Sequence, residues 1–116
     1  MSVIAKATEL VTGQQLMVIV WEGITEGDTG APQQIGGWVK SAYVQVTGDD
    51  GDETLTMQGS IDGTNYFSLT KVDGSTAMTF TDEGGLPIAQ LPLYIRPSLS
   101  GSADDGDLDV MLLLRG

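Results

Sequence analysis

The sequence predicts an all-β protein: a single-domain antiparallel β-sandwich, jelly-roll-like, with about eight strands. Short segments in which apolar and polar residues alternate recur along the chain, and turns that contain Gly and Asp separate them. No segment shows the 3.6-residue period of an amphipathic helix. The chain has 16 Gly and only 6% aromatic residues, a composition typical of many short strands joined by tight turns.

The length of 116 residues, with no internal repeat or linker, predicts one domain over residues 1–116. Residues 22–37 are rich in Gly and contain Pro, so they are expected to form a long loop. Loops of this length usually carry function or contact another molecule. Pro87 and Pro92 predict a sheet edge, or a switch between sheets, within the segment that they interrupt. The predicted strands cover residues 3–11, 16–21, 38–47, 54–60, 67–70, 76–81, 86–99 and 108–115.

Alternation also predicts which side chains form the core, because successive side chains of a strand point to opposite faces. Phe67 and Leu112 are expected to be core residues, and truncating either should cost about 3–5 kcal/mol by leaving a cavity. The side chains expected to point inward are Ala42, Val44, Val46, Phe67, Leu69, Met78, Phe80, Leu91, Leu93, Ile95, Leu108, Val110, Leu112 and Leu114.

A β-hairpin is expected in the middle of the chain, because Asp62-Gly63 lies between two alternating segments. Gly adopts positive φ at no steric cost, and Asp can accept hydrogen bonds from its own loop backbone. We therefore expect Gly63 to have φ > 0 and Asp62 to shape the turn.

Two of the predicted strands are apolar on both faces, although a sandwich has only one inner face per sheet. In the strand 16–21, the outward set is either Met17, Ile19 and Trp21 or Leu16, Val18 and Val20. Exposed apolar patches of this size are rare on monomers, so we expect a homo-oligomer, a dimer or trimer, or another covering protein. The interface candidates are Met17, Ile19, Trp21, Trp38, Met111 and Leu113.

The charge of the chain excludes several classes of function. Five basic residues face 16 acidic ones, a net charge of −11, so binding to nucleic acid phosphates is not expected. An acidic surface of this kind suits docking onto a basic partner. The chain has no run of 18 apolar residues, so no membrane span is expected, and its first residues lack the pattern of a signal peptide.

Catalytic chemistry is not expected either. The chain contains no His and no Cys, which removes imidazole bases, thiol nucleophiles and the usual zinc ligands. Its carboxylates lie in Gly-rich turns, where solvent keeps them ionised, and no Gly-x-Ser-x-Gly or Ser-x-x-Lys motif occurs. We therefore predict a protein that is not an enzyme and has no cofactor.

Two acidic turns, near residues 49–53 and 104–109, allow two interpretations. If the strands alternate in direction, these turns fall at one end of the sandwich, and crowded carboxylates there could bind Ca²⁺. Neither turn has the EF-hand spacing, and solvated turn residues explain the same composition. The residues of the candidate cation site are Asp49, Asp50, Asp52, Asp104, Asp105 and Asp107.

The aromatic residues also allow two interpretations. They could form a platform on which sugar rings stack, or they could pack in the core and at subunit interfaces. The residues concerned are Trp21, Trp38, Tyr43, Tyr66 and Tyr94.

One stretch carries a family resemblance. Ser60-Ile61-Asp62-Gly63-Thr64-Asn65-Tyr66 resembles the Ser-x-Asp-Gly-x-x-aromatic hairpin of discoidin-like, galactose-binding-like β-sandwiches. With Gln58-Gly59 before it and Leu69 after it, the stretch is more similar to small virion proteins of tailed bacteriophages. The segment 94–99, followed by a Gly/Asp loop and a last apolar strand, resembles the same phage proteins. The resemblance covers residues 55–115, about half of the chain.

This resemblance implies a non-enzymatic structural virion protein of a tailed phage. The expected role is a capsid decoration (cement) protein that docks on the major capsid protein, or on another virion protein, at the capsid surface. The alternative is a carbohydrate-binding, host-attachment module of the discoidin-like type. A binding module needs exposed aromatic residues on one face, whereas a decoration protein needs apolar surface that contacts other subunits.

Overall fold

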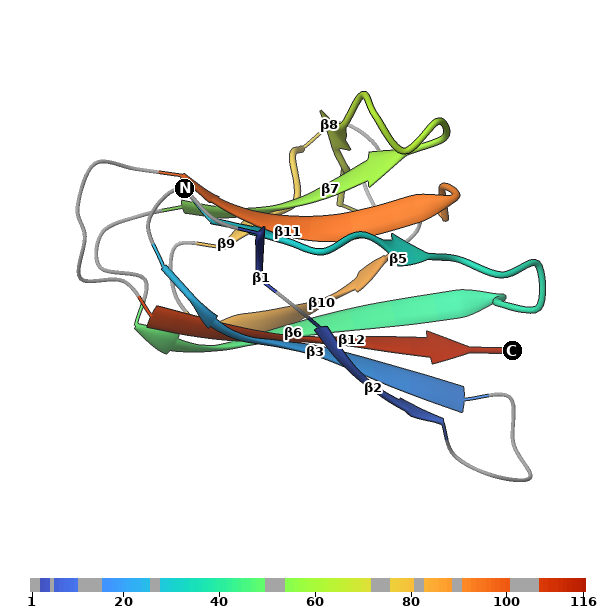
Figure 1. Cartoon of the computed structure of the whole chain (residues 1–116), viewed down its shortest axis with the longest axis horizontal. Coiled ribbons are helices and arrows are strands. Elements are labelled where there is room, and N and C mark those ends of the chain that lie inside the picture. The colour runs from blue at the N-terminus through green and yellow to red at the C-terminus, as the bar shows by residue number, and fades with distance from the viewer. Residues whose placement is uncertain are drawn as a thin grey trace.

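The computed structural model describes residues 3–4, 6–10, 16–25, 28–49, 54–71, 76–80, 83–88, 91–100 and 107–116. Within these residues, twelve strands form two sheets that lie face to face (Figure 1), and there is no helix. The described part of the chain accordingly has no helix long and apolar enough to cross a membrane. The predicted all-β sandwich is confirmed.

One sheet has five strands, and all its neighbouring pairs are antiparallel. Its central strand β12 pairs along its length with β6 on one side and with β3 on the other. In sheet order the strands are β10 (Gly84–Ile88), β6 (Ser41–Asp49), β12 (Asp107–Arg115), β3 (Leu16–Ile24) and β2 (Lys6–Leu10).

The other sheet has seven strands and is built around the pair β11–β7, which runs from Tyr94 opposite Ser60 to Ser100 opposite Thr54. One edge carries β1, which pairs with β4 in parallel. The strands are β1 (Val3–Ile4), β4 (Thr29–Gly30), β5 (Gln33–Gln34), β11 (Tyr94–Ser100), β7 (Thr54–Ser60), β8 (Phe67–Ser68) and β9 (Thr79–Phe80).

The pairing of the strands is nested along the chain, as in a jelly roll. Strand β3 pairs with β12, β4 and β5 pair with β11, β6 pairs with β10, and β7 pairs with β8 and β9. Each pair stays within one sheet while the chain passes back and forth between the sheets. The segment interrupted by prolines contains both features that were predicted for it. Pro87 lies on the edge strand β10, and the chain changes sheet between β10 and β11.

The core lies between the inner faces of the two sheets. Alternate residues of β6, β7, β11 and β12 point into it, which matches the predicted alternation. Trp21 is its largest fully buried side chain, and its indole N–H donates to the backbone oxygen of Ala31 at 2.9 Å. Burying the indole with this partner avoids an unsatisfied donor inside the protein. The fully buried large side chains are Trp21, Ile19, Ile24, Leu55, Met57, Met78, Ile95, Leu99, Leu108, Leu112 and Leu114.

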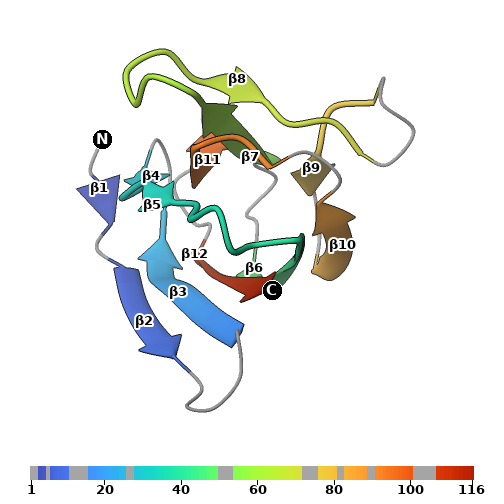
Figure 2. The same cartoon turned by 90° about the vertical axis from the view of Figure 1, so that its right-hand side faces the viewer.

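Two expected core residues are exposed instead. Phe67 is 73% exposed, because β8 is only two residues long and lies outermost in its sheet (Figure 2), so the alternation ends before Leu69. Leu93 is 48% exposed, because it precedes the first residue of β11 and is not part of the strand's alternation. The prediction that both point inward is wrong.

The region predicted as a loop, residues 22–37, is partly strand. Strand β3 continues to Ile24, and two short strands, β4 and β5, follow and pair with β11. Their two-residue lengths leave no alternation to detect in the sequence, since a period of two needs several residues to be visible.

Candidate functional site

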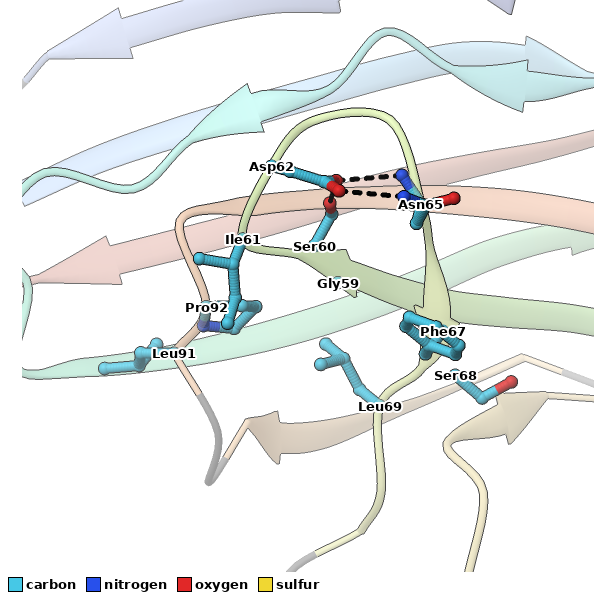
Figure 3. Close-up of a pocket in the computed structure, with 10 residues that line it drawn as sticks. All are labelled: Gly59, Ser60, Ile61, Asp62, Asn65, Phe67, Ser68, Leu69, Leu91 and Pro92. Atoms are coloured by element: carbon cyan, nitrogen blue, oxygen red, sulfur yellow. Dashed lines mark hydrogen bonds between the residues drawn. The ribbon is translucent and has the colours of Figure 1, made fainter.

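The central hairpin loop is organised by the carboxylate of Asp62 (Figure 3). The hydroxyl of Ser60 donates to it at 2.9 Å, and the backbone N–H groups of Thr64 and Asn65 donate at 2.8 and 2.9 Å. The side-chain amide of Asn65 adds a fourth bond at 2.8 Å. Gly63 has a φ of 76° and donates its N–H to the Ser60 hydroxyl at 2.9 Å. The predicted positive φ of Gly63 and the turn-shaping role of Asp62 are confirmed.

These bonds favour the charged form of the carboxylate, so they lower the pKa of Asp62 below its ordinary value. The backbone N–H of Asn65 has the largest effect, followed by that of Thr64. A group whose pKa is lowered by folding stabilises the folded state above its unfolded pKa and loses this contribution as the pH falls. The loop should therefore be best ordered at neutral pH.

We expect an acid-dependent contribution from this loop. Replacing Asp62 with Asn removes the charge and places an amide donor among the loop's N–H donors, so the melting temperature should fall at pH 6. As the pH falls below the ordinary aspartate pKa of about 4, the unfolded chain takes up a proton at Asp62 while the hydrogen-bonded carboxylate of the folded loop stays charged, so the stabilisation and the difference between wild type and Asp62→Asn should shrink. Thermal melts of both proteins from about pH 6 to about pH 2 measure it. A difference that stays constant with pH would contradict the assigned role of the carboxylate.

The loop also packs onto strand β11. The guanidinium of Arg96 lies 3.8 Å from the ring centre of Tyr66, and its Nε–H donates to the side-chain oxygen of Gln58 at 2.9 Å. A Cβ atom on Gly63 would lie 3.3 Å from Cε2 of Tyr94, so the loop backbone approaches that ring closely. Burial raises the pKa of Tyr66, and the charge of Arg96 opposes this effect. The loop is thus held by both its own hydrogen bonds and its contacts with the sheet.

A groove of about 650 Å³ lies beside this loop. In Figure 3, Ile61, Leu91 and Pro92 lie on one side and Phe67 and Leu69 on the other. Its lining residues are Gly59, Ser60, Ile61, Asp62, Asn65, Phe67, Ser68, Leu69, Leu91 and Pro92. The groove is therefore mainly apolar, with polar groups along the loop.

Two large apolar side chains that line this groove are exposed to solvent. Ile61 is 76% exposed and Phe67 is 73% exposed. Gly59, which also lines the groove, is buried, and a Cβ atom there would lie 2.5 Å from Cγ of Pro92. The arrangement could take an apolar side chain of a partner protein, because the exposed rings and branched chains surround a concave surface.

A second apolar surface lies on the other side of the sandwich, on the outer face of the five-stranded sheet. We call it the outer face and define it by Val18, Val20, Tyr43, Met111 and Leu113. Leu113 lies between Val18 and Tyr43 in the register, and Met111 lies opposite Val20. Tyr43 is 44% and Met111 is 38% exposed, and the others are half-buried.

The structure decides which side chains of β3 point into the core and which point outward. Ile19 and Trp21 are fully buried, and Met17 packs against the core, so these three interface candidates point inward and the alternative that placed them outward is wrong. The side chains of Leu16, Val18 and Val20 form the outward set. Of the remaining interface candidates, Met111 and Leu113 lie on the outer face, and Trp38 is half-buried against the core.

One acidic turn follows the end of β6 and the other precedes the start of β12, and these two strand ends are neighbours. Asp49 and Asp107 are register partners in the pair β6–β12, so the chain leaves β6 and enters β12 side by side, as expected. Asp50, Asp52, Asp104 and Asp105 lie outside the described residues. Among the residues that the structure does describe, no group of three or more acidic side chains could hold a metal ion.

The five aromatic residues do not share one face. Trp21 is buried, Trp38 is half-buried, and Tyr43 lies on the outer face. Tyr66 and Tyr94 lie on the other sheet, beside Arg96 and the hairpin loop. The structure thus places the residues of the possible sugar platform in three separate parts of the molecule.

The sequence reasoning missed the groove because it placed Phe67 in the core. No local signal marked this error, because Tyr66 lies outside β8 and the two residues of that strand are too few to show an alternation.

No protein-family model matches the chain, and no curated protein matches it. Among solved structures, the SPBc2 prophage-derived protein YomS matches with a TM-score of 0.65 at 14% identity, over 91% of this chain and 97% of that one. The two proteins have the same fold.

More distant matches have TM-scores below 0.5. The cysteine peptidase Peruvianin-I from Thevetia peruviana latex has a TM-score of 0.44 at 12% identity, over 88% of this chain and 51% of that chain. A carbohydrate binding module from Cellvibrio mixtus lichenase 5A, in complex with cellotriose, has a TM-score of 0.35 at 15% identity, over 96% of this chain and 86% of that chain.

Proposed function

We propose that this chain is a non-enzymatic structural virion protein of a tailed phage, a capsid decoration protein that docks on the major capsid protein at the capsid surface. The observation that carries the proposal is the pair of open apolar side chains, Ile61 and Phe67, at the groove beside the hydrogen-bonded hairpin loop. A loop backbone that is already held by hydrogen bonds loses little conformational entropy on binding, and aromatic anchors that become buried dominate many interfaces.

Three further observations support this proposal. The net charge of −11 would draw the protein toward basic loops of a capsid subunit and oppose non-specific aggregation. The fold is that of a prophage-derived protein, and jelly-roll sandwiches are common among viral capsid components. The resemblance of the hairpin to phage virion proteins falls on the same loop that borders the groove.

Co-sedimentation with empty capsids of the encoding phage tests the proposal. The wild-type protein should pellet with the capsids at micromolar concentration. Phe67→Ser and Ile61→Ser should each weaken binding by about tenfold or more, because each removes an apolar anchor at the groove. Leu93→Ser is the matched control: Leu93 is an exposed apolar residue that does not line the groove, so its replacement should leave binding unchanged.

The outcomes separate the proposal from the carbohydrate-binding alternative. A wild-type protein that ignores capsids overturns the decoration role. If that protein also binds a glycan on an array, the host-attachment module takes its place. Equal loss of capsid binding in all three variants would show that the groove is not the docking surface.

A further inference from the structure

The outer face of the five-stranded sheet has no cover within the described part of the chain. Figures 1 and 2 show the seven-stranded sheet on the opposite side of the five-stranded one, and no described element lies over the outer face. Tyr43 and Met111 are its most exposed large apolar side chains. Because monomers rarely leave such a surface in water, something of complementary shape and charge should cover it.

The outer face is flat where it meets the edge strand. A Cβ atom on Gly85 of β10 would lie 2.6 Å from the hydroxyl oxygen of Tyr43, so the ring of Tyr43 lies over a position that has no side chain. A hollow of about 320 Å³ lies between Tyr43, Leu113 and Arg115, where a facing side chain would fit. Flat apolar faces with such hollows pack well against a second sheet, at about 10 Å between sheets.

The charges on this surface run from basic to acidic along the strands. Arg115 lies near one end of β12 and Asp109 near the other, and the apolar residues Leu113 and Met111 lie between them on the same face. The register between β3 and β12 shifts here, so that Glu22 and Gly23 both lie between the pairs Trp21–Val110 and Ile24–Leu108, opposite Asp109. The Gly23 N–H donates to the Asp109 carboxylate at 3.0 Å, which leaves this carboxylate charged at the same end of the face as Glu22. Arg115 and Glu22 are exposed, and neither forms an ion pair with any residue that the structure describes.

We propose that the outer face is a homodimer interface, on which a second copy of this chain packs about a two-fold axis that runs across the strands. Such an axis, passing between the rows of Leu113 and Met111, reverses the strand direction of the second copy. The basic end at Arg115 of each copy then meets the acidic end at Glu22 and Asp109 of the other copy. An axis along the strands would instead place the two Arg115 side chains together, and the two acidic ends together.

The charge pattern is what selects a second copy as the occupant. A protein with a net charge of −11 repels its own copies unless opposite charges meet locally, and this face supplies both signs in the order that two-fold symmetry requires. Five strands about 4.8 Å apart and up to nine residues long give a face of roughly 600 Å², or about 1,200 Å² for both copies, which is the lower limit for a stable interface. The groove lies on the other sheet, so this inference does not rest on the proposed function.

Analytical ultracentrifugation of the purified chain at micromolar concentration tests the dimer. The wild type should sediment as a dimer, and Met111→Glu should be a monomer or dissociate at least about tenfold more readily, because it places a charge in the apolar centre. Leu93→Glu is the matched control and should remain a dimer, because Leu93 is an exposed apolar residue that lies outside the five-stranded sheet and does not line the groove. Far-UV circular dichroism shows that each variant is folded. A monomeric wild type, or a Met111→Glu protein that dimerises as the wild type does, overturns the proposal.

Charge reversal and cross-linking test the axis. Arg115→Glu should weaken the dimer, and adding Glu22→Arg to the same chain should restore it. Because the chain has no Cys, single cysteines report neighbours directly: a mixture of Arg115→Cys and Glu22→Cys proteins should be joined by a short bismaleimide. Arg115→Cys alone should give little cross-linked dimer. Strong self-linking of Arg115→Cys, with no link between the two different variants in the mixture, would overturn the proposed arrangement.

Discussion

Truncating Leu112 to Ala should lower the free energy of unfolding by about 2–5 kcal/mol. Leu112 is fully buried in the middle of β12. It lies opposite Ile19 of β3 and Val44 of β6, which are also fully buried. With paired strands on both sides, the backbone has little freedom to close the cavity, so the cost should be in the upper part of this range. Equilibrium urea denaturation, followed by the fluorescence of the two Trp residues, measures the change.

Phe67→Ala is the control for this experiment, since the sequence suggested the same loss at both positions. Phe67 is 73% exposed, so its truncation should change the free energy of unfolding by less than about 0.5 kcal/mol. A loss of stability as large as that of Leu112→Ala would mean that Phe67 is buried, and the groove would then not exist in the form described.

Replacing Gly30 with Ala should destabilise the protein by about 3 kcal/mol, the upper end of the usual cost of overpacking. A Cβ atom on Gly30 would lie 2.5 Å from Cδ of Pro97 and 2.7 Å from Cδ1 of Trp21. Both neighbours are rings, and Trp21 and Pro97 are themselves buried, so neither side chain can turn away. The strand β4 must move instead, which disturbs its pairing with β11.

Gly37→Ala is the matched control. Gly37 is exposed, does not have a positive φ, and a Cβ atom there meets no other atom within 4 Å. This change should be neutral, or should stabilise the protein by up to about 1 kcal/mol by restricting the unfolded chain. Urea denaturation of the two variants in parallel compares them. Equal effects would show that the close contact with Trp21 and Pro97 is not what matters at Gly30.

The long strands could be predicted because each has one buried face. The predicted segment Thr54–Ser60 has the same bounds as β7, and the alternate residues of β12 that were expected inside are buried. Where apolar and polar residues alternate, a shift by one residue would expose the whole apolar set, so the pattern identifies both the strand and its inner face. The hairpin loop could be predicted for a different reason, since Asp-Gly turn chemistry is local.

The short and outer strands could not be predicted in the same way. Strands β4, β5, β8 and β9 have two residues each, so their place depends on the longer strands β7 and β11 that they pair with. The exposure of Phe67 follows from the position of β8 outside β7, which no local pattern encodes. The groove was missed because it combines that outer strand with Leu91 and Pro92, which come from a distant part of the chain.

The amino-acid sequence was sufficient for the fold class, the turn at Asp62-Gly63 and the existence of more apolar surface than one core can bury. It left open which side of β3 faces outward, because both parities of Leu16–Trp21 are apolar. Only the tertiary structure decided this: the bulky indole of Trp21 lies between the sheets, close to Gly30, and its N–H finds Ala31 as a partner. With Trp21 held inside, Val18 and Val20 had to join Met111 and Leu113 on the outer face, since side chains along a strand alternate between its two faces.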